Sequence, residues 1–270
     1  MGMAENIRYD EQDSRLDAFT GKPEDVKNLS LFMEIGAMMI RNGSEVKRVE
    51  DTLRRMGAAY GAVRMDVFAI TSTLVCTMNM PGGYVCSMTR GTRDGTKTDF
   101  WKLERINALS REYCRKPFGA EELKVRIDEI EGATADRLRV CIGSVLAAGT
   151  LAVFFGGNIA DGLAAAVFAV GIWLMQVYFA PICKNNILFN FLCSFAIGVL
   201  IGLTGRVIPI HEDKVMIGDI MLLIPGLALT NAVKDMFVGD TITGSLRLVE
   251  SLLWAAAIAC GFALAVFITK

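Results

Sequence analysis

The chain of 270 residues carries 28 Lys and Arg against 29 Asp and Glu, so its formal net charge of −1 gives no reason to expect nucleic acid as a partner. The charges are unevenly placed. Residues 1–139 hold 22 of the basic and 22 of the acidic residues, which leaves 6 and 7 for residues 140–270. The second half has too little polar surface to face water. We therefore predict a polytopic α-helical membrane protein that begins with a small soluble α+β domain.

The first part of the chain, residues 1–22, is polar and acidic and has no apolar core. We expect a disordered tail there and no cleaved signal peptide.

Residues 23–135 predict the soluble domain. Apolar residues at helical spacing favour helices over 23–41 and from 44 to about 60. A run rich in β-branched residues over 63–80, a turn at 79–83 and a strand over 84–89 predict a hairpin, which two further helices follow, one capped by Asp99 and one over 121–130.

The soluble domain offers little that indicates chemistry. The loop over 91–98 carries two glycines, but a phosphate-binding loop needs a Gly immediately before Lys97, and Thr96 stands there. The single histidine, His211, lies with two acidic residues in the other half, in what we interpret as a loop between spans. We predict no enzyme, no catalytic residue, no cofactor and no metal site.

Residues 136–270 predict a membrane domain of five transmembrane helices. The apolar segments cover residues 140–156, 163–182, 187–205, 215–229 and 248–269. The fourth is short, contains Asp219 and is interrupted by Pro225 and Gly226. Arg137 and Arg139 precede the first span and the turn after it has no basic residue, so we expect a multi-pass protein of the plasma or inner membrane with its soluble domain in the cytoplasm.

Polar and small residues follow one face of the third span. Asn190, Ser194, Gly198 and Gly202 recur at every fourth position, and Gln176 stands on the second span. The face allows two interpretations. It serves close helix packing, or it lines a polar pathway, for which the candidates are Gln176, Asn190, Ser194 and Asp219.

The interrupted fourth segment is the strongest pointer to a function. Pro225 removes a backbone donor and clashes with the preceding turn. In lipid such a break persists only against protein or a wet cavity, and broken helices recur at transporter substrate sites. Ionisable residues follow the break closely. The predicted substrate-binding residues are Pro225, Gly226, Thr230, Asn231, Lys234, Asp235, Asp240, Arg247 and Glu250. The alternative is a set of interfacial charges that anchor a loop.

The same stretch carries a family resemblance. Residues 224–231, Ile-Pro-Gly-Leu-Ala-Leu-Thr-Asn, followed by the charged residues from Asp235 to Glu250, resemble the signature of the threonine/serine exporter family. Residues 42–53, from Asn42-Gly43-Ser44-Glu45 to Leu53, resemble the start of that family's N-terminal domain. The resemblance implies export of threonine and serine driven by the proton gradient.

The resemblance also implies a partner. Fused family members continue into a second membrane block, whereas this chain has five predicted spans. It is therefore similar to the separate-subunit form, including the larger subunit of the two-part succinate exporter. That form implies a smaller second membrane subunit that supplies the C-terminal half. Homo-oligomerisation is left open.

We predict a subunit of a secondary active exporter in the lipid bilayer, for small carboxylate-bearing metabolites, with threonine and serine ahead of succinate. A membrane-anchored sensor or scaffold is the alternative from another class, although an anchor needs no broken span.

Overall fold

The computed structural model describes residues 22–92, 99–133, 136–183 and 185–270. The predicted disordered tail lies outside the described residues apart from Lys22, and so does most of the 91–98 loop. The chain divides into two compact units. The described part of the front unit comprises residues 22–44, 48–92 and 103–130. The rest, mainly residues 136–270, forms the membrane unit.

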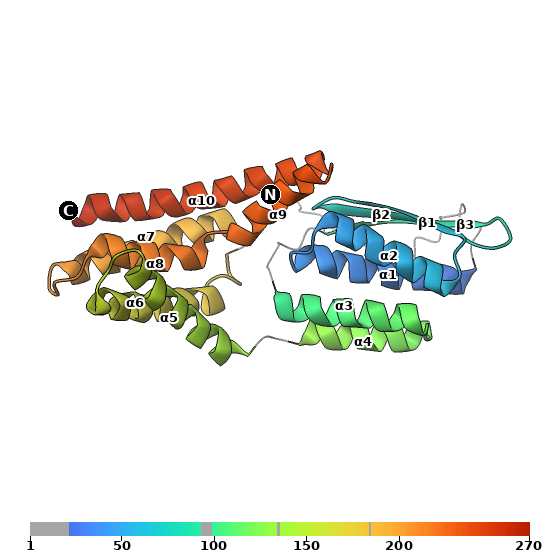
Figure 1. Cartoon of the computed structure of the whole chain (residues 1–270), viewed down its shortest axis with the longest axis horizontal. Helices are drawn as coiled ribbons and strands as arrows, with labels where there is room; N and C mark the ends of the chain where they lie inside the picture. Colours follow the sequence, from blue (N-terminus) through green and yellow to red (C-terminus); the bar gives the residue numbers. More distant parts are fainter. Residues whose placement is uncertain (1–21, 93–98, 134–135, 184) are drawn as a thin grey trace, which may run out of the picture. The chain divides into compact units, whose positions relative to one another are not determined.

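The front unit combines helices with a small sheet (Figure 1). Its described elements are α1 (Pro23–Arg41), α2 (Val46–Tyr60), β1 (Arg64–Ala69), β2 (Thr73–Asn79), β3 (Val85–Gly91), α3 (Phe100–Arg115) and α4 (Ala120–Gly132). The first helix has the predicted limits, with Pro23 in its first turn. Asp99 also acts as predicted, because its side chain accepts a hydrogen bond of 3.0 Å from the Lys102 amide.

The sheet has three antiparallel strands in the order β1-β2-β3. The predicted hairpin is present as β2 and β3, but the prediction of a single strand before its turn is wrong. The β-branched run over 63–80 is two strands that reverse at residues 70–72, where Ala69 pairs with Leu74. The reversal contains neither Gly nor Pro, the residues that mark a turn in sequence. Thr92 holds it instead, since its hydroxyl donates to the Thr71 carbonyl at 2.6 Å.

The buried face of the sheet supports the first helix. The side chains of β1 alternate between exposed and buried, and α1 packs against β2 and β3. A Cβ placed on Gly36 of α1 would lie 2.8 Å from side-chain atoms of both Leu53 and Leu74, so glycine permits this close approach. One turn before Gly36 on α1, the ring of Phe32 meets that of Tyr113 edge to face at 5.3 Å.

The membrane unit is helical throughout its described residues. Its elements are α5 (Arg137–Phe154), α6 (Ile159–Tyr178), α7 (Asn186–Gly205), α8 (Glu212–Leu223), α9 (Gly226–Phe237) and α10 (Thr241–Thr269). Four of them, α5, α6, α7 and α10, are long and apolar enough to cross a bilayer. The pair α8 and α9 passes the same test only when taken together, with a bend of 55° between the two helices.

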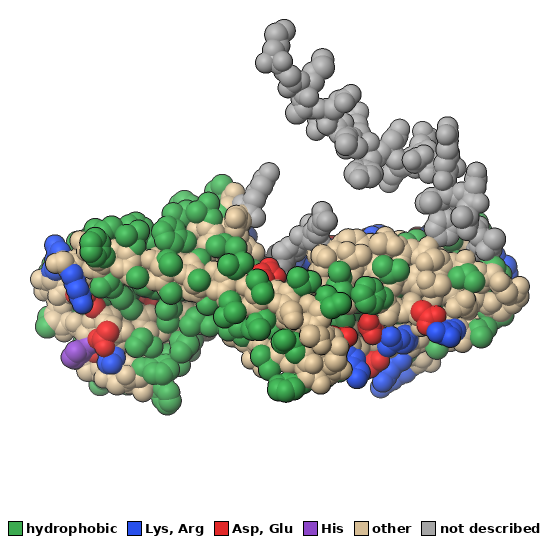
Figure 2. Space-filling view, turned by 90° about the horizontal axis from the view of Figure 1, so that it is seen from above, with side chains coloured by type: hydrophobic (Ala, Val, Ile, Leu, Met, Phe, Trp, Pro, Cys, Tyr) green, Lys and Arg blue, Asp and Glu red, His purple; other side chains and the backbone are tan. Residues whose placement is uncertain are grey.

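The predicted fourth segment is therefore broken at Pro225, as expected, and it is a bent span or a re-entrant loop. The last helix differs from the prediction, because α10 begins at Thr241 and not near Leu248. Gly244, expected in a turn, lies inside α10. Hydrophobic side chains dominate the visible surface of the membrane unit, and most of the charged side chains in view belong to the front unit (Figure 2).

Small residues allow the helices of the membrane unit to approach closely. A Cβ on Gly218 of α8 would lie 2.6 Å from the Ala148 carbonyl oxygen of α5, and a Cβ on Gly198 of α7 would lie 2.7 Å from the Ala265 Cβ of α10. In lipid, where helices gain little from hydrophobic association, such contacts carry much of the packing energy.

Candidate functional site

The break between α8 and α9 is built by local backbone geometry. Ile224 is extended, with φ −62° and ψ 129°, and the residue before a proline favours that conformation. Pro225 occupies the N-cap of α9 and gives no side-chain hydrogen bond to the new helix. The first amides of α9 therefore receive no side-chain cap. The Thr230 hydroxyl donates to the Gly226 carbonyl of its own helix at 2.9 Å.

A buried ion pair joins the two helices after the break. The Asp235 carboxylate of α9 and the Arg247 guanidinium of α10 lie 2.9 Å apart, with 3% and 7% of the two side chains exposed. Close packing makes the pair possible, since a Cβ on Gly244 of α10 would lie 2.7 Å from the Ala232 carbonyl oxygen of α9. A charge pair this well shielded from solvent persists only with good geometry, so these helices are fixed against each other.

The other predicted substrate-binding residues are less closely gathered. Asn231 is half-buried one helical turn before Asp235, on the same face of α9. Lys234 and Glu250 are exposed. Asp240 is the N-cap of α10, where its side chain makes no capping bond.

Distance separates the predicted residues into two groups. Gly226 precedes Asp235 by nine residues, and a helix rises about 1.5 Å per residue, so about 13 Å lies between the start of α9 and the ion pair. The two charged groups of a threonine or serine molecule are attached to a single carbon and cannot span that distance. The structure thus brings together Asp235 and Arg247, with Asn231 one turn away on the same face of α9, while Pro225 and Gly226 lie at the other end of that helix.

The small-residue face of α7 packs against α10. The Ser194 hydroxyl donates to the Asn190 carbonyl of its own helix at 2.8 Å, and a Cβ on Gly261 of α10 would lie 2.0 Å from that hydroxyl oxygen. A Cβ on Gly202 would meet the Thr269 side chain just as closely. This arrangement favours the packing interpretation for Ser194. A pathway role for the half-buried Asn190 and Gln176 stays a prediction.

Asp219 stands out among the predicted pathway residues. It is 0% exposed on α8, and both of its carboxylate oxygens lack a hydrogen-bond partner among the residues that the structure describes.

A polar connection at one end of the membrane unit was missed by the sequence interpretation, which placed His211 in a plain loop. His211 is the N-cap of α8, and its Nδ1 lies 2.8 Å from Asp161, the first-turn acid of α6. The Asp161 carboxylate also accepts from the amides of His211 and Asn158 at 2.8 and 2.7 Å. The spacing Asn158-x-x-Asp161, a capping box, was the available sequence signal.

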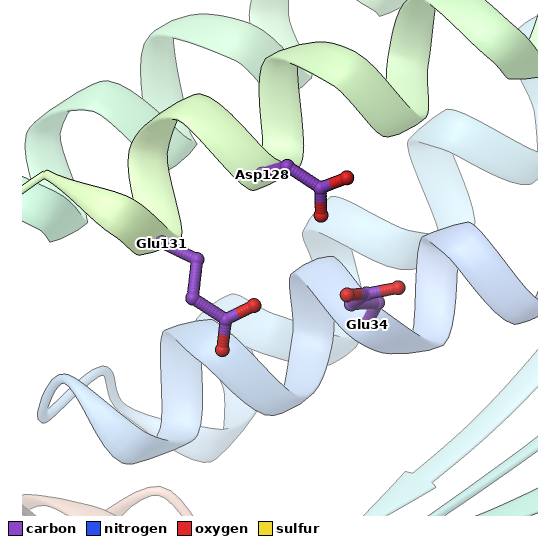
Figure 3. Close-up of side chains that lie close together, drawn as sticks. All are labelled: Glu34, Asp128 and Glu131. Carbon is purple, nitrogen blue, oxygen red and sulfur yellow. The ribbon is translucent and has the colours of Figure 1, made fainter.

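Helices α1 and α4 carry three neighbouring carboxylates, those of Glu34 on α1 and of Asp128 and Glu131 on α4 (Figure 3). One oxygen of each lies within 4.8 Å of the others. Lys124 lies among them, with its ammonium 3.1 Å from Glu34 and 2.8 Å from Asp128, and Arg90 lies 3.7 Å from Glu34. Because Lys124 and Arg90 already pair with two of these acids, the arrangement is that of an ion-pair network.

Comparison with known proteins supplies the family. Residues 30–269 match the family model ThrE, described as "Putative threonine/serine exporter". No curated protein and no solved structure matches the chain. The match covers both units, including the break at Pro225 and the buried Asp235–Arg247 pair. The chain therefore belongs to the threonine/serine exporter family.

Proposed function

We propose that this protein is a membrane exporter of small zwitterionic metabolites, threonine and serine foremost, and that the Asp235–Arg247 pair with Asn231 forms its substrate site. The observation that carries the proposal is the buried pair at 2.9 Å, which joins α10 to α9, the helix that follows the break. Ionisable residues inside membrane helices are rare, and those placed beside a broken helix are a recurrent feature of transporter sites.

The charges of the pair fit an amino acid. A zwitterion offers an ammonium group for Asp235 and a carboxylate for Arg247, so that each partner of the ion pair exchanges one charged contact for another. A side-chain amide at Asn231, one turn away, can donate to the substrate carboxylate.

A dicarboxylate such as succinate fits less well. It brings two negative charges and needs two cationic groups, yet Arg247 is already balanced by Asp235. Like charge close to Asp235 would raise the free energy of the bound state. This comparison supports threonine and serine ahead of succinate.

The orientation and the partner also belong to this proposal. Arg137 and Arg139 at the start of α5 support a cytoplasmic front unit. A second membrane subunit would complete the transport pathway, and we keep it as a prediction.

Transport in membrane vesicles from the native cells, which contain any partner subunit, tests the proposal. The double variant Asp235→Asn with Arg247→Gln removes both charges but leaves two groups that can hydrogen-bond. The variant is produced in native cells that lack the chromosomal copy, and the vesicles are prepared from these cells. We expect it to insert normally into the membrane and to lose threonine and serine export. Asn231→Ala should weaken export in the same direction.

A matched variant removes one charge of each sign from exposed positions of the same helices, Lys234→Gln with Glu250→Gln. We expect it to retain export. Equal export by wild type and the Asp235/Arg247 variant, or loss only in the exposed variant, would move the site elsewhere. Succinate flux with no threonine flux in the wild type would overturn the substrate assignment.

A further inference from the structure

The geometry of α8 points to a second functional group in the membrane unit. We propose that Asp219 is a proton-binding site, and that the proton it takes up and releases drives export. The part of this inference that concerns transport rests on the proposed exporter function. The part that concerns proton binding does not.

The position of Asp219 is that of an apolar core residue. Val215 and Leu223, one turn before and one turn after it on the same face of α8, are both buried in the hydrophobic core of the membrane unit. Asp219 is 0% exposed, and neither oxygen of its carboxyl group has a hydrogen-bond partner.

Its surroundings provide no positive charge within the described residues. Towards α5, the α8 face at Gly218 meets Ala148 and Ala152, which do not ionise. On α7 the nearby titratable group is the thiol of Cys193, itself 0% exposed.

Some charged groups on the packed helices have other partners, and the rest, Arg137 and Arg139 of α5 and Glu250 of α10, are exposed. On α6, Asp161 is held by His211 and Asn158. On α10, Arg247 pairs with Asp235. On α8 itself the charged residues are Glu212, Asp213 and Lys214 in the first turn, more than one turn from Asp219.

A bare carboxylate in such a place has a high free energy, so the group is neutral while it remains enclosed. A proton suits the site better than a metabolite ammonium or a metal ion, since each of those needs several oxygen ligands and room for the ion. A proton needs only the carboxyl group.

A proton can leave only when the environment of Asp219 becomes polar. Pro225, where α8 meets α9 at 55°, follows Asp219 by six positions, which is less than two helical turns. A change of that angle would alter the access of water to α8, because Asp219 lies so close to the break. Proton release would thereby follow the same movement that exposes the substrate site.

Infrared spectroscopy of the purified protein tests proton binding directly. A protonated carboxyl group absorbs apart from carboxylate, and the band shifts in deuterated water. We expect such a band at neutral pH in the wild type and its loss in Asp219→Asn, which keeps the size of the side chain. Asp213→Asn, which removes an exposed acid from the same helix, should retain it. A band of equal intensity in Asp219→Asn would overturn the inference.

Transport in the native-membrane vesicles described above tests the coupling. Exchange of labelled for unlabelled threonine needs no net proton movement, whereas accumulation against a gradient does. We expect Asp219→Asn to exchange threonine at the wild-type rate and to lose accumulation driven by an imposed pH gradient. Gradient-driven accumulation equal to wild type would overturn the coupling role.

The two proposals fail separately. If the wild type transports no amino acid, the exporter proposal fails, while loss of the infrared band in Asp219→Asn would still support proton binding. If the wild type exchanges threonine and Asp219→Asn keeps both the band and the response to pH, only the present inference fails. Asp219→Leu, which suits the apolar core, provides a folded variant if Asn is poorly tolerated.

Discussion

Two carboxylates of the membrane unit are equally buried but differently surrounded. Asp235 lies 2.9 Å from the Arg247 guanidinium, whereas Asp219 lies among apolar side chains with both oxygens unpartnered. Burial alone therefore does not define the role of an acid in a membrane helix. A carboxylate paired with a cation can exchange that partner for a substrate ammonium, while an unpaired one is suited to a group that gains and loses a proton.

Of the changes that test this comparison, breaking the ion pair should have the largest effect on stability. Arg247→Ala would leave Asp235 buried without its cation, and removal of one partner of a buried pair costs about 3–5 kcal/mol. We expect a strong loss of folded protein, measured as the fraction of the protein in detergent that stays monodisperse after gentle heating. The double variant Asp235→Asn with Arg247→Gln should recover most of that loss. Equal stability of Arg247→Ala and wild type would show that the pair is solvated.

Disturbing the close packing of the membrane helices should have the next largest effect on stability. Gly198→Leu would place a bulky side chain where a single Cβ already lies 2.7 Å from Ala265, so α7 and α10 must separate. Overpacking of this kind costs about 1–3 kcal/mol. We expect a lower unfolding temperature in detergent and reduced export. As a control, Leu200→Ala changes an exposed position of α7 and should have little effect on folding.

Replacing the unpaired acid should change stability in the opposite direction, towards a more stable protein. Asp219→Leu removes a buried polar group that has no hydrogen bond and fills the same core position, and leaving such a group unsatisfied costs about 1–3 kcal/mol. We expect a gain in stability of that order, read from resistance to denaturing detergent, together with loss of gradient-driven export. A less stable Asp219→Leu protein would mean that the native carboxyl has a partner in the membrane.

The sequence predicted this contrast only in part. The composition of residues 140–270 and the Pro225-Gly226 dipeptide were sufficient to predict apolar spans and the break, because both follow from local chemistry. Asp219, Asp235 and Arg247 were all chosen as candidates. Their separation into a pair and a lone acid could not be predicted, since Asp235 and Arg247 are twelve residues apart on different helices.

Two further misses have the same physical origin. The extra strand of the front sheet depends on a reversal at residues 70–72 that Thr92, far along the chain, holds in place. Gly244 looked like a turn residue because the sequence does not show that α9 approaches α10 so closely there. Tertiary contacts, which leave no local pattern, decide such positions.

The front unit supplies a third kind of buried carboxylate, and with it the smallest expected effect. Asp25 of α1, which is 4% exposed, accepts hydrogen bonds from the hydroxyls of Tyr60 at 2.6 Å and Tyr84 at 2.9 Å. Burial and the hydrogen bond to Asp25 raise the pKa of the Tyr60 hydroxyl above its usual value. The neutral hydroxyl is thus favoured in the folded state. Its contribution to stability is complete below about pH 10, the ordinary tyrosine pKa, and is lost as the pH rises further.

Tyrosinate absorbance of the full chain can measure this late titration. We expect Asp25→Asn to lower the pKa of Tyr60, because the substitution removes the negative charge that opposes ionisation. The difference between each protein and its Tyr60→Phe counterpart isolates the signal. Tyr113 is the internal control, since burial, with a smaller contribution from the Cys114 thiol, raises the pKa of its hydroxyl to about 12 without a contribution from Asp25. If the Tyr60 curves of Asp25→Asn and wild type coincide, Asp25 does not carry its charge against these hydroxyls. In that case it would resemble the lone acid of α8 more than the paired acid of α9.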